Sequence, residues 1–218
     1  MINVERCPLC RGQGLRLFFS RIDKVFGARV YDHCLTCDLV FLKPHLRLSV
    51  EAERERYRAH QNSPSDEGYV RFLNRLLIPL KERIPAGAKG LDYGCGPGPT
   101  ISVLMENENY QVVNYDPAFF PNEDAFFSEY QFITCTEVIE HVCDPKNIFK
   151  ILFDLLRKDG VLAIMTQVRY DNVNFKEWWY PKDPTHICFF SNRTFAWIAN
   201  CFKIKWESPV DNVIFFQK

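Results

Sequence analysis

The sequence has no long hydrophobic run and no excess of charge of either sign. No apolar stretch approaches the roughly 20 residues that a membrane-spanning helix needs, and the first residues lack the basic segment and apolar core of a secretory signal. Lys and Arg together number 27, as do Asp and Glu, so the formal net charge is zero. A general nucleic-acid coat protein needs a clear excess of basic residues. We therefore expect a cytoplasmic protein without a membrane span.

The composition is that of a globular protein. Apolar residues make up 47% and aromatic residues 15% of the 218 residues, which excludes the disordered, collagen-like and coiled-coil classes. This length allows one domain of ordinary size and a small additional module.

Nine cysteines include two pairs with the same spacing. Two residues separate Cys7 from Cys10 and Cys34 from Cys37, with 23 residues between the pairs. Two residues between thiolates let both sulfurs reach one ion, and two such turns complete a tetrahedron. The spacing predicts a structural zinc site, because four protein ligands leave no position open for water.

Two other interpretations of these pairs are free core cysteines and a redox pair. A redox pair is disfavoured, because neither pair lies between a strand and a helix of a parallel sheet. The five other cysteines show no ligand spacing and are interpreted as small buried hydrophobic residues: Cys95, Cys135, Cys143, Cys188 and Cys201.

The first half of the chain is expected to hold a small β module and a helical bridge. Residues 1–48 contain strand-forming stretches around the cysteines, at 15–19, 25–33 and 38–42. Residues 49–87 are expected to form two helices. The first covers 50–61, and the second follows Ser65 as N-cap and is kinked or split at Pro79. Three side chains of this bridge are interpreted as surface residues: Tyr57, His60 and Tyr69.

Strands and helices alternate from residue 88 to residue 218, which predicts an α/β fold with a mainly parallel sheet. The strand at 161–165 is apolar throughout, as expected for a strand buried on both faces. The other expected strands are 88–93, 110–116, 131–135, 202–206 and 213–216. The expected helices are 100–105, 146–157, closed by Gly160, and 191–200.

A glycine loop, Gly94-Cys-Gly-Pro-Gly98, joins the first of these strands to a helix. Strand, glycine loop and helix is the Rossmann-like arrangement that brings a ligand close to the backbone. The dinucleotide fingerprint needs a third glycine at position 99, which is Pro99. Asp116 ends the next strand and could accept hydrogen bonds from two ribose hydroxyls.

These motifs resemble those of class I S-adenosylmethionine-dependent methyltransferases. The segment Leu91–Gly98 resembles their first motif, Tyr115-Asp116 their ribose-binding position, and Thr136–His141 their fourth motif. The Asp159-Gly160 turn before a strand is also similar. A cysteine ribbon precedes this domain in a subset of the superfamily.

The resemblance implies roles for particular residues. The glycines would let the backbone approach the cofactor, Asp92 would hold its ammonium group directly or through water, and Asp116 would bind the ribose. Pro117 to Phe119 would contact the adenine ring, and Thr136 and Glu137 would line the pocket for the methionine part of the cofactor. The implied cofactor-binding residues are Asp92, Gly94, Cys95, Gly96, Gly98, Asp116, Pro117, Thr136 and Glu137.

The segment after Asp116 departs from the family pattern. About fourteen residues separate it from the next strand, where the family places a helix and an outer strand. The adenine contacts therefore stay open, and the sheet is expected to have six strands. A structural turn at the glycines and a solvent-facing Asp116 are the alternative interpretations.

Two histidines and a carboxylate are candidates for catalysis. A base is needed only if the methyl acceptor loses a proton, and His141, Glu140 and His186 could supply one. Capping, loop or core roles for the histidines stay open. The stretch Glu137–His141 also resembles quinone O-methyltransferases. This resemblance implies an alternative role, in which Glu137, Glu140 and His141 bind a divalent cation.

The sequence leaves three functions open. The first is a methyltransferase that acts on a small-molecule acceptor, the second a zinc-ribbon RNA methyltransferase, and the third a cofactor-binding protein without activity. Residues 1–90 hold 16 basic and 10 acidic side chains, and the rest hold 11 and 17. The first part is only mildly basic, which disfavours RNA. The acceptor, its atom type and the oligomeric state are not predicted.

Overall fold

The computed structural model describes residues 5–58 and 63–218, which form two compact units. The first unit comprises the chain up to Ser49 together with Ile139–Phe149 and Gln167–Lys203. The second comprises Val50–Val138, Lys150–Thr166 and Ile204–Lys218. The division of the chain into a β module (1–48), a helical bridge (49–87) and an α/β domain (88–218) stays a prediction.

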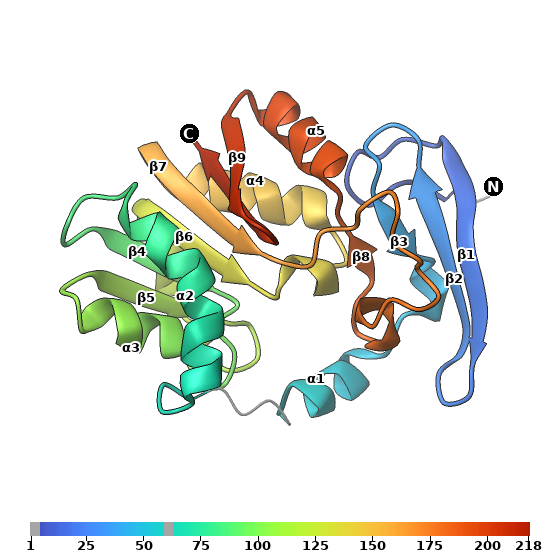
Figure 1. The fold of residues 1–218 in the computed structure, drawn as a ribbon, viewed down its shortest axis with the longest axis horizontal. Coiled ribbons are helices and arrows are strands. Elements are labelled where there is room, and N and C mark those ends of the chain that lie inside the picture. The colour runs from blue at the N-terminus through green and yellow to red at the C-terminus, as the bar shows by residue number, and fades with distance from the viewer. Residues whose placement is uncertain (1–4, 59–62) are drawn as a thin grey trace. The chain divides into compact units, whose positions relative to one another are not determined.

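The second unit is built on one six-stranded sheet, as the shortened segment after Asp116 predicted. Its strand order is β5-β4-β6-β7-β10-β9 (Figure 1). Four strands run parallel: β4 (Lys89–Tyr93), β5 (Gln111–Tyr115), β6 (Tyr130–Thr136) and β7 (Leu156–Met165). The strand β10 (Val213–Gln217) pairs antiparallel with β7, and β9 (Lys205–Val210) pairs antiparallel with β10. The mainly parallel α/β fold is confirmed.

Helices flank this sheet and close its core. The helix α2 (Glu67–Lys81) crosses the sheet in Figure 1 and buries four leucines at helical spacing, Leu73, Leu76, Leu77 and Leu80. They pack with Phe132, Ala163 and Phe215 from the strands. The helix α3 (Thr100–Glu106) follows β4, and α4 (Pro145–Leu155) follows β6. The short 3-10 helix η2 (Glu123–Phe127) lies between β5 and β6.

The helical bridge differs from the prediction at two residues. The N-cap of α2 is Asp66 and not Ser65, because the Asp66 carboxylate accepts hydrogen bonds from the backbone N–H groups of Gly68 and Tyr69. Pro79 does not split the helix, which ends two residues later at Lys81. The helix α1 (Val50–Arg58) buries no residue, as its charge predicts. His60 lies outside the described residues.

Two boundaries near the end of the chain also differ. The helix α4 ends at Leu155, and Gly160 lies inside β7, where residues 157–160 interrupt the register with β6. Asp159 has a φ of 63° there, and a Cβ on Gly160 would lie 2.9 Å from the Arg157 carbonyl oxygen. The strand expected at 202–206 begins at Lys205, because the preceding helix continues to Phe202.

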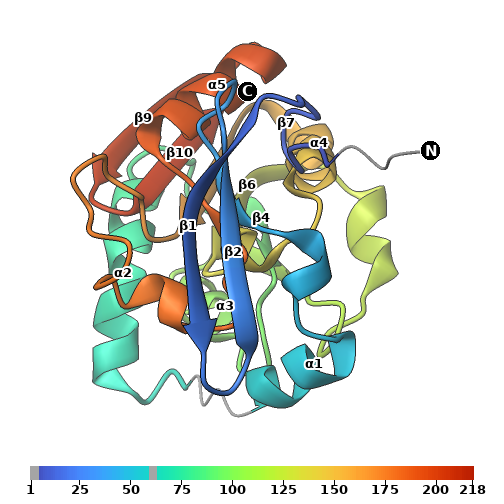
Figure 2. The same cartoon turned by 90° about the vertical axis from the view of Figure 1, so that its right-hand side faces the viewer.

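The first unit contains a four-stranded antiparallel sheet and one α-helix. Its strand order is β1-β2-β3-β8, with β1 (Leu15–Asp23) and β2 (Gly27–Cys34) forming the long hairpin of Figure 2. The strand β3 (Val40–Leu42) pairs with β8 (Cys188–Phe189), which the sequence did not predict. The helix α5 (Asn192–Phe202) begins at the N-cap Ser191. Three 3-10 helices complete the unit: Pro44–Leu46, Ile139–His141 and Tyr180–Lys182.

A buried charge network joins the distant segments of the first unit. The Asp38 carboxylate accepts hydrogen bonds from Arg169 at 2.6 Å and from the Ser191 hydroxyl. His33 Nε2 lies 2.7 Å from its other oxygen. The side chains of Asp38 and Arg169 are each only 5% exposed. None of the helices in the described part of the chain is long and apolar enough to cross a membrane.

Candidate functional site

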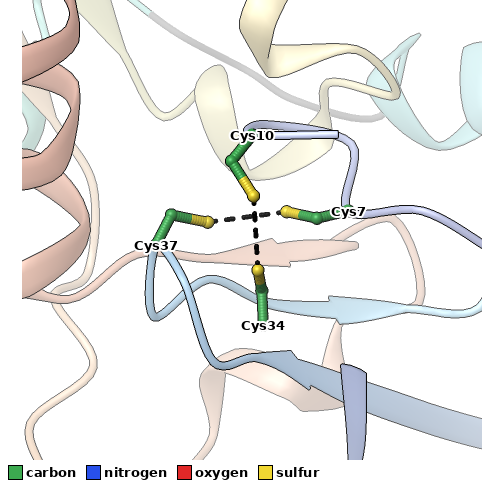
Figure 3. Close-up of side chains that lie close together, drawn as sticks. All are labelled: Cys7, Cys10, Cys34 and Cys37. Atoms are coloured by element: carbon green, nitrogen blue, oxygen red, sulfur yellow. Dashed lines mark hydrogen bonds between the residues drawn. The ribbon is translucent and has the colours of Figure 1, made fainter. Parts of the chain in front are cut away.

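The four cysteines of the two pairs meet at one point in the first unit (Figure 3). The sulfurs of Cys7 and Cys37 lie 3.5 Å apart, and those of Cys10 and Cys34 lie 3.4 Å apart. Four sulfurs around zinc, with bonds of about 2.3 Å, lie about 3.8 Å from one another. The cluster therefore has the size and the donor set of a zinc site.

The two cysteine turns have the same local backbone. The residue after each second cysteine, Arg11 or Asp38, is left-handed, with φ of 64° and 63°. Its N–H donates to the carbonyl oxygen of the first cysteine, at 3.0 Å in one turn and 2.9 Å in the other. Equal turns thus present both pairs of sulfurs to the same point.

The remaining cysteines do not share one environment. Cys95, Cys135 and Cys188 are buried, as predicted. Cys143 and Cys201 are exposed, so their interpretation as buried hydrophobic residues is wrong. Neither belongs to a cluster of metal-ligand type among the described residues.

The glycine loop in the second unit needs glycine at its first two positions. Gly94 and Gly96 have φ of 76° and 65°, where side chains are disfavoured. A Cβ on Gly94 would lie 2.4 Å from Cγ2 of Val138. The N–H groups of Gly94 and Cys95 both donate to the Tyr115 carbonyl oxygen, at 2.7 Å and 3.2 Å, which fastens the loop to the end of β5.

Asp116 is brought to this loop. Its Oδ2 accepts a hydrogen bond from the Gly96 N–H at 3.2 Å, and its Oδ1 accepts from the N–H groups of Ala118 and Phe119 at 2.8 Å and 3.1 Å. The carboxylate therefore orders both the glycine loop and the turn that contains Pro117, which is exposed.

Asp92 is a buried carboxyl group at the end of β4. It is 3% exposed, and the Thr134 hydroxyl donates to it at 2.7 Å. Burial raises the pKa of Asp92 to about 7, although the hydrogen bond from Thr134 acts in the opposite direction. A cationic ligand beside Asp92 would favour its charged form.

The end of β6 carries two further predicted residues. The buried Oγ1 of Thr136 has no hydrogen-bond partner among the described residues. Glu137 has a φ of 52°, which is uncommon for a residue other than glycine. Its N–H donates a hydrogen bond to the backbone carbonyl oxygen of Met165 at 2.8 Å. An unsatisfied buried hydroxyl beside a strained backbone is typical of a ligand site.

The sequence did not indicate Tyr69 as part of this site. Burial raises the pKa of Tyr69 to about 12, and the negative charges of Asp92 and Glu137 add to the shift. The Tyr69 hydroxyl is therefore within electrostatic reach of both carboxylates. The interpretation of Tyr69 as a surface residue is therefore only partly right, because the side chain is half-buried and packs against the core of the second unit.

The first unit holds the three predicted catalytic residues together. The ligand atoms of Glu140, His141 and His186 all lie within 4.8 Å of one another. The two imidazole rings meet edge to face, with their centroids 4.7 Å apart. Glu137, which the alternative cation site included, belongs to the second unit.

Backbone carbonyl groups fix both imidazoles. Nδ1 of His186 lies 2.8 Å from the Tyr180 carbonyl oxygen, and Nδ1 of His141 lies 3.1 Å from that of Thr185. Because a carbonyl oxygen only accepts, each Nδ1 is the protonated nitrogen, and each Nε2 is basic in the neutral ring. Burial lowers the pKa of His186, against the opposing charge of Glu140, so its ring is neutral at neutral pH.

Tyr180 connects the members of this cluster. Its hydroxyl donates to Oε1 of Glu140 at 2.5 Å, and its carbonyl oxygen accepts from His186. Both Tyr180 and Glu140 are fully buried. No spacing signal in the sequence points to the Tyr180 hydroxyl.

Comparison with known proteins identifies relatives of part of the chain. Ubiquinone biosynthesis O-methyltransferases of Erwinia tasmaniensis and Salmonella paratyphi A are each 28% identical to it over 116 residues. The match covers 42% of the chain and 46% of each relative, so it spans about half the length of those relatives.

Two solved structures have a similar fold. A SAM-dependent methyltransferase from Archaeoglobus fulgidus is 16% identical, with a TM-score of 0.52 over 77% of this chain and 99% of that one. The 1,6-didemethyltoxoflavin-N1-methyltransferase of Burkholderia thailandensis, solved with its substrate and S-adenosylhomocysteine, is 13% identical, with a TM-score of 0.50 over 85% and 98%. At these identities the likeness concerns the fold alone.

A family model described as "Methyltransferase domain" matches residues 57–202, about two thirds of the chain. The match includes the glycine loop, Asp116 and the Glu140 cluster, whereas the four-cysteine cluster precedes it. The chain belongs to this methyltransferase domain family.

Proposed function

We propose that the protein is an S-adenosylmethionine-dependent methyltransferase that acts on a small molecule. The observation that carries this proposal is the hydrogen bond between Asp116 and the backbone of Gly96. This hydrogen bond supports the proposal, because it holds a carboxylate that could bind a ribose beside the glycine loop. The fold likeness to a methyltransferase that was solved with S-adenosylhomocysteine supports the same donor.

The residues at the ends of β4, β5 and β6 fit the parts of this cofactor. Asp116 would bind the ribose, and Asp92 would face the ammonium group, whose positive charge would stabilise a carboxylate in this buried position. The unsatisfied hydroxyl of Thr136 would gain a partner. Glycine at positions 94 and 96 allows the left-handed backbone of the loop, and at position 94 it also avoids a clash with Val138. When bound, the cofactor supplies an electrophilic methyl group on a sulfonium.

The cluster of Glu140, His141 and His186 would act on the acceptor. The chain's own contribution to methyl transfer is to position the acceptor, exclude water and, where the acceptor is a hydroxyl or a carbon acid, handle its proton. His186 Nε2 is the basic atom of a buried neutral imidazole, which suits this task. The names of the matched relatives, O-methyltransferases, favour a hydroxyl acceptor.

The four cysteines would bind a structural zinc ion. With all four ligands from the protein, no open position is left for a substrate. Elemental analysis should give about one zinc per chain after extensive dialysis, and its absence with intact thiols would contradict this assignment.

Calorimetry with S-adenosylmethionine and S-adenosylhomocysteine tests the donor. We expect binding by the full chain and a loss of about tenfold in Asp116→Asn, which removes the charge but keeps the shape. Asp124→Asn, in the nearby 3-10 helix, is the matched control and should bind normally. Absence of binding at millimolar ligand would overturn the proposed donor, and tight binding of NADH would favour a dehydrogenase instead.

A further inference from the structure

A buried arginine of the first unit has no carboxylate partner. Arg29 on β2 is 1% exposed, and within the described part of the chain no ion pair joins it to a carboxylate. The other buried arginine of this unit, Arg169, is 5% exposed and has the Asp38 carboxylate at 2.6 Å. A buried cation without a counter-ion is costly. The surroundings of Arg29 therefore suit an anion that comes from outside the chain.

Backbone carbonyl groups hold the Arg29 guanidinium between two segments of the first unit. Its Nη1 donates to the Leu46 carbonyl oxygen at 3.2 Å, and its Nη2 donates to that of Pro184 at 2.8 Å. The buried Nε has no hydrogen-bond partner among the described residues. Two of the five N–H donors are used in this way. Because a carbonyl oxygen is uncharged, these hydrogen bonds orient the cation and do not neutralise it.

A second guanidinium extends from the same turn. Arg47 directly follows Leu46, whose carbonyl oxygen accepts from Arg29. The side chain of Arg47 forms no hydrogen bond or ion pair with any residue that the structure describes, and its Nε is buried. Burial raises the pKa of the Cys188 thiol, and the positive charge of Arg47 is the largest influence in the opposite direction. Arg47 is therefore within electrostatic reach of β8, which begins four residues after Pro184.

The charges around these two arginines stay positive on balance. Arg21 stands opposite Arg29 in the register of β1 and β2, and like charges in such positions repel each other. Among the described residues, Asp23 is the one carboxylate that forms an ion pair with any of the three arginines, at 3.8 Å from Arg21. Hydrogen bonds from two backbone N–H groups lower the pKa of Asp23, and the charges of Arg21 and Arg29 add to this shift.

We propose that Arg29 and Arg47 bind an anionic group, a carboxylate or a phosphate, of the methyl acceptor. Both groups accept the parallel N–H bonds that a guanidinium offers. Arg47 is half-buried and gives access from solvent, and the deeper Arg29 supplies a charge that solvent screens little. The class of acceptor rests on the proposed function, whereas the binding of an anion does not.

One segment connects this anion site to the proposed acid–base group. The Pro184 carbonyl group that Arg29 holds lies two residues before His186, and two residues span at most about 7 Å. Nδ1 of His186 is fixed by the Tyr180 carbonyl oxygen, which leaves Nε2 as the basic atom. A small acceptor whose hydroxyl lies a few bonds from its anionic group therefore matches the spacing of the two sites.

Calorimetric titration of the full chain with inorganic phosphate and with acetate, at constant ionic strength, tests the anion site. We expect saturable binding of about one anion per chain, with a dissociation constant on the order of 1 mM. Arg47→Gln should weaken this binding about tenfold or more, because it removes charge-assisted hydrogen bonds. Arg29→Lys keeps the buried charge but loses the planar fork, and should weaken it about threefold or more. Tighter binding of phosphate indicates a phosphate-bearing acceptor, and tighter binding of acetate a carboxylate.

The matched control is Arg16→Gln, which removes an exposed arginine of β1 and should bind both anions as the wild type does. Circular dichroism and the thermal unfolding transition establish that each variant is folded. Lack of saturable binding of either anion up to about 50 mM, or equal binding by Arg47→Gln and the wild type, would overturn the proposal. Anion binding without affinity for S-adenosylmethionine would refute the proposed donor and leave the anion site standing.

Discussion

The two compact units differ in how far apart in sequence their interacting residues lie. In the second unit each parallel strand follows a helix or short turn, and the residues of the glycine loop, Asp116 and Thr136 come at successive strand ends. In the first unit the cysteine module is completed by β8 and by Arg169, which lie more than a hundred residues later. Local alternation thus builds the proposed cofactor site, and long-range contacts build the first unit.

The largest expected effect comes from removal of the predicted zinc site. Cys37→Ser should lose the metal and most of the ordered structure of β1, β2 and β3, because binding of structural zinc contributes on the order of 10 kcal/mol in small zinc modules. The backbone amides of the sheet in the second unit should stay protected from hydrogen exchange. Hydrogen exchange measured strand by strand, together with zinc analysis, shows whether the loss of order is confined to the first unit.

The control for this variant is Cys201→Ser, which changes an exposed cysteine of the same unit. Zinc content and exchange should be as in the wild type. Equal protection of β2 in Cys37→Ser and the wild type would show that the first unit does not depend on the metal.

A second prediction concerns the charge network that joins the cysteine module to the later segments. Asp38→Ala leaves Arg169 buried without its carboxylate, which should cost about 3–5 kcal/mol in the free energy of unfolding. Denaturant titration measures it. Asp154→Ala breaks an exposed ion pair with Lys150 and should cost less than about 0.5 kcal/mol. Similar losses in both variants would contradict the role of the network.

The third prediction separates the units by function. His186→Ala should lower turnover about 100-fold or more, the usual range for loss of an acid–base group. The dissociation constant for S-adenosylmethionine should change little, because its proposed site lies in the second unit. Steady-state kinetics on an accepted substrate measure turnover, and calorimetry measures the dissociation constant. An equal loss of cofactor affinity in His186→Ala would contradict the assignment of the two roles to different units.

The fourth prediction concerns a pH dependence at Asp92. Its pKa is raised to about 7 in the folded protein, whereas the unfolded chain gives up this proton near pH 4. The folded state therefore binds more protons between these values, and stability falls as the pH rises through that window. Cofactor affinity should rise over the acidic part of the range and level off above about pH 7, because the ammonium group favours the carboxylate.

Asp92→Asn tests this pH dependence. The slope of stability between pH 4 and 7 should decrease in the variant, and cofactor affinity should become nearly independent of pH. Calorimetry at a series of pH values follows the second effect. A wild-type affinity that falls between pH 5 and 7 would have the wrong sign and would contradict the role of Asp92.

The sequence was informative where chemistry repeats at short range. The apolar strand at 161–165 and the leucines of α2 predicted the sheet and its core, and the spacing of Cys7, Cys10, Cys34 and Cys37 predicted their convergence. Asp116 was expected near the glycine loop, because adjacent parallel strands end at one edge of a sheet.

What the sequence could not predict depends on tertiary contacts. The strand β8 has only two residues, which is too few to show a strand pattern in the sequence. It is a strand because it pairs with β3. Tyr180 reads as one more aromatic residue until its hydroxyl reaches Glu140. The helix after Pro145 was expected to end near Gly160, but a left-handed Asp159 places that glycine within β7 instead.

The pairing of β3 with β8 also sets an order of events during synthesis. About 150 residues separate these strands, so a ribosome adding roughly 5–20 residues per second needs on the order of ten to thirty seconds to supply the second after the first. Until then the outer edge of β3, whose three residues are all buried in the folded chain, has no neighbour from β8. An unpaired apolar strand edge is a template for association with other chains. Association of the nascent protein with other chains is therefore most favoured during this interval.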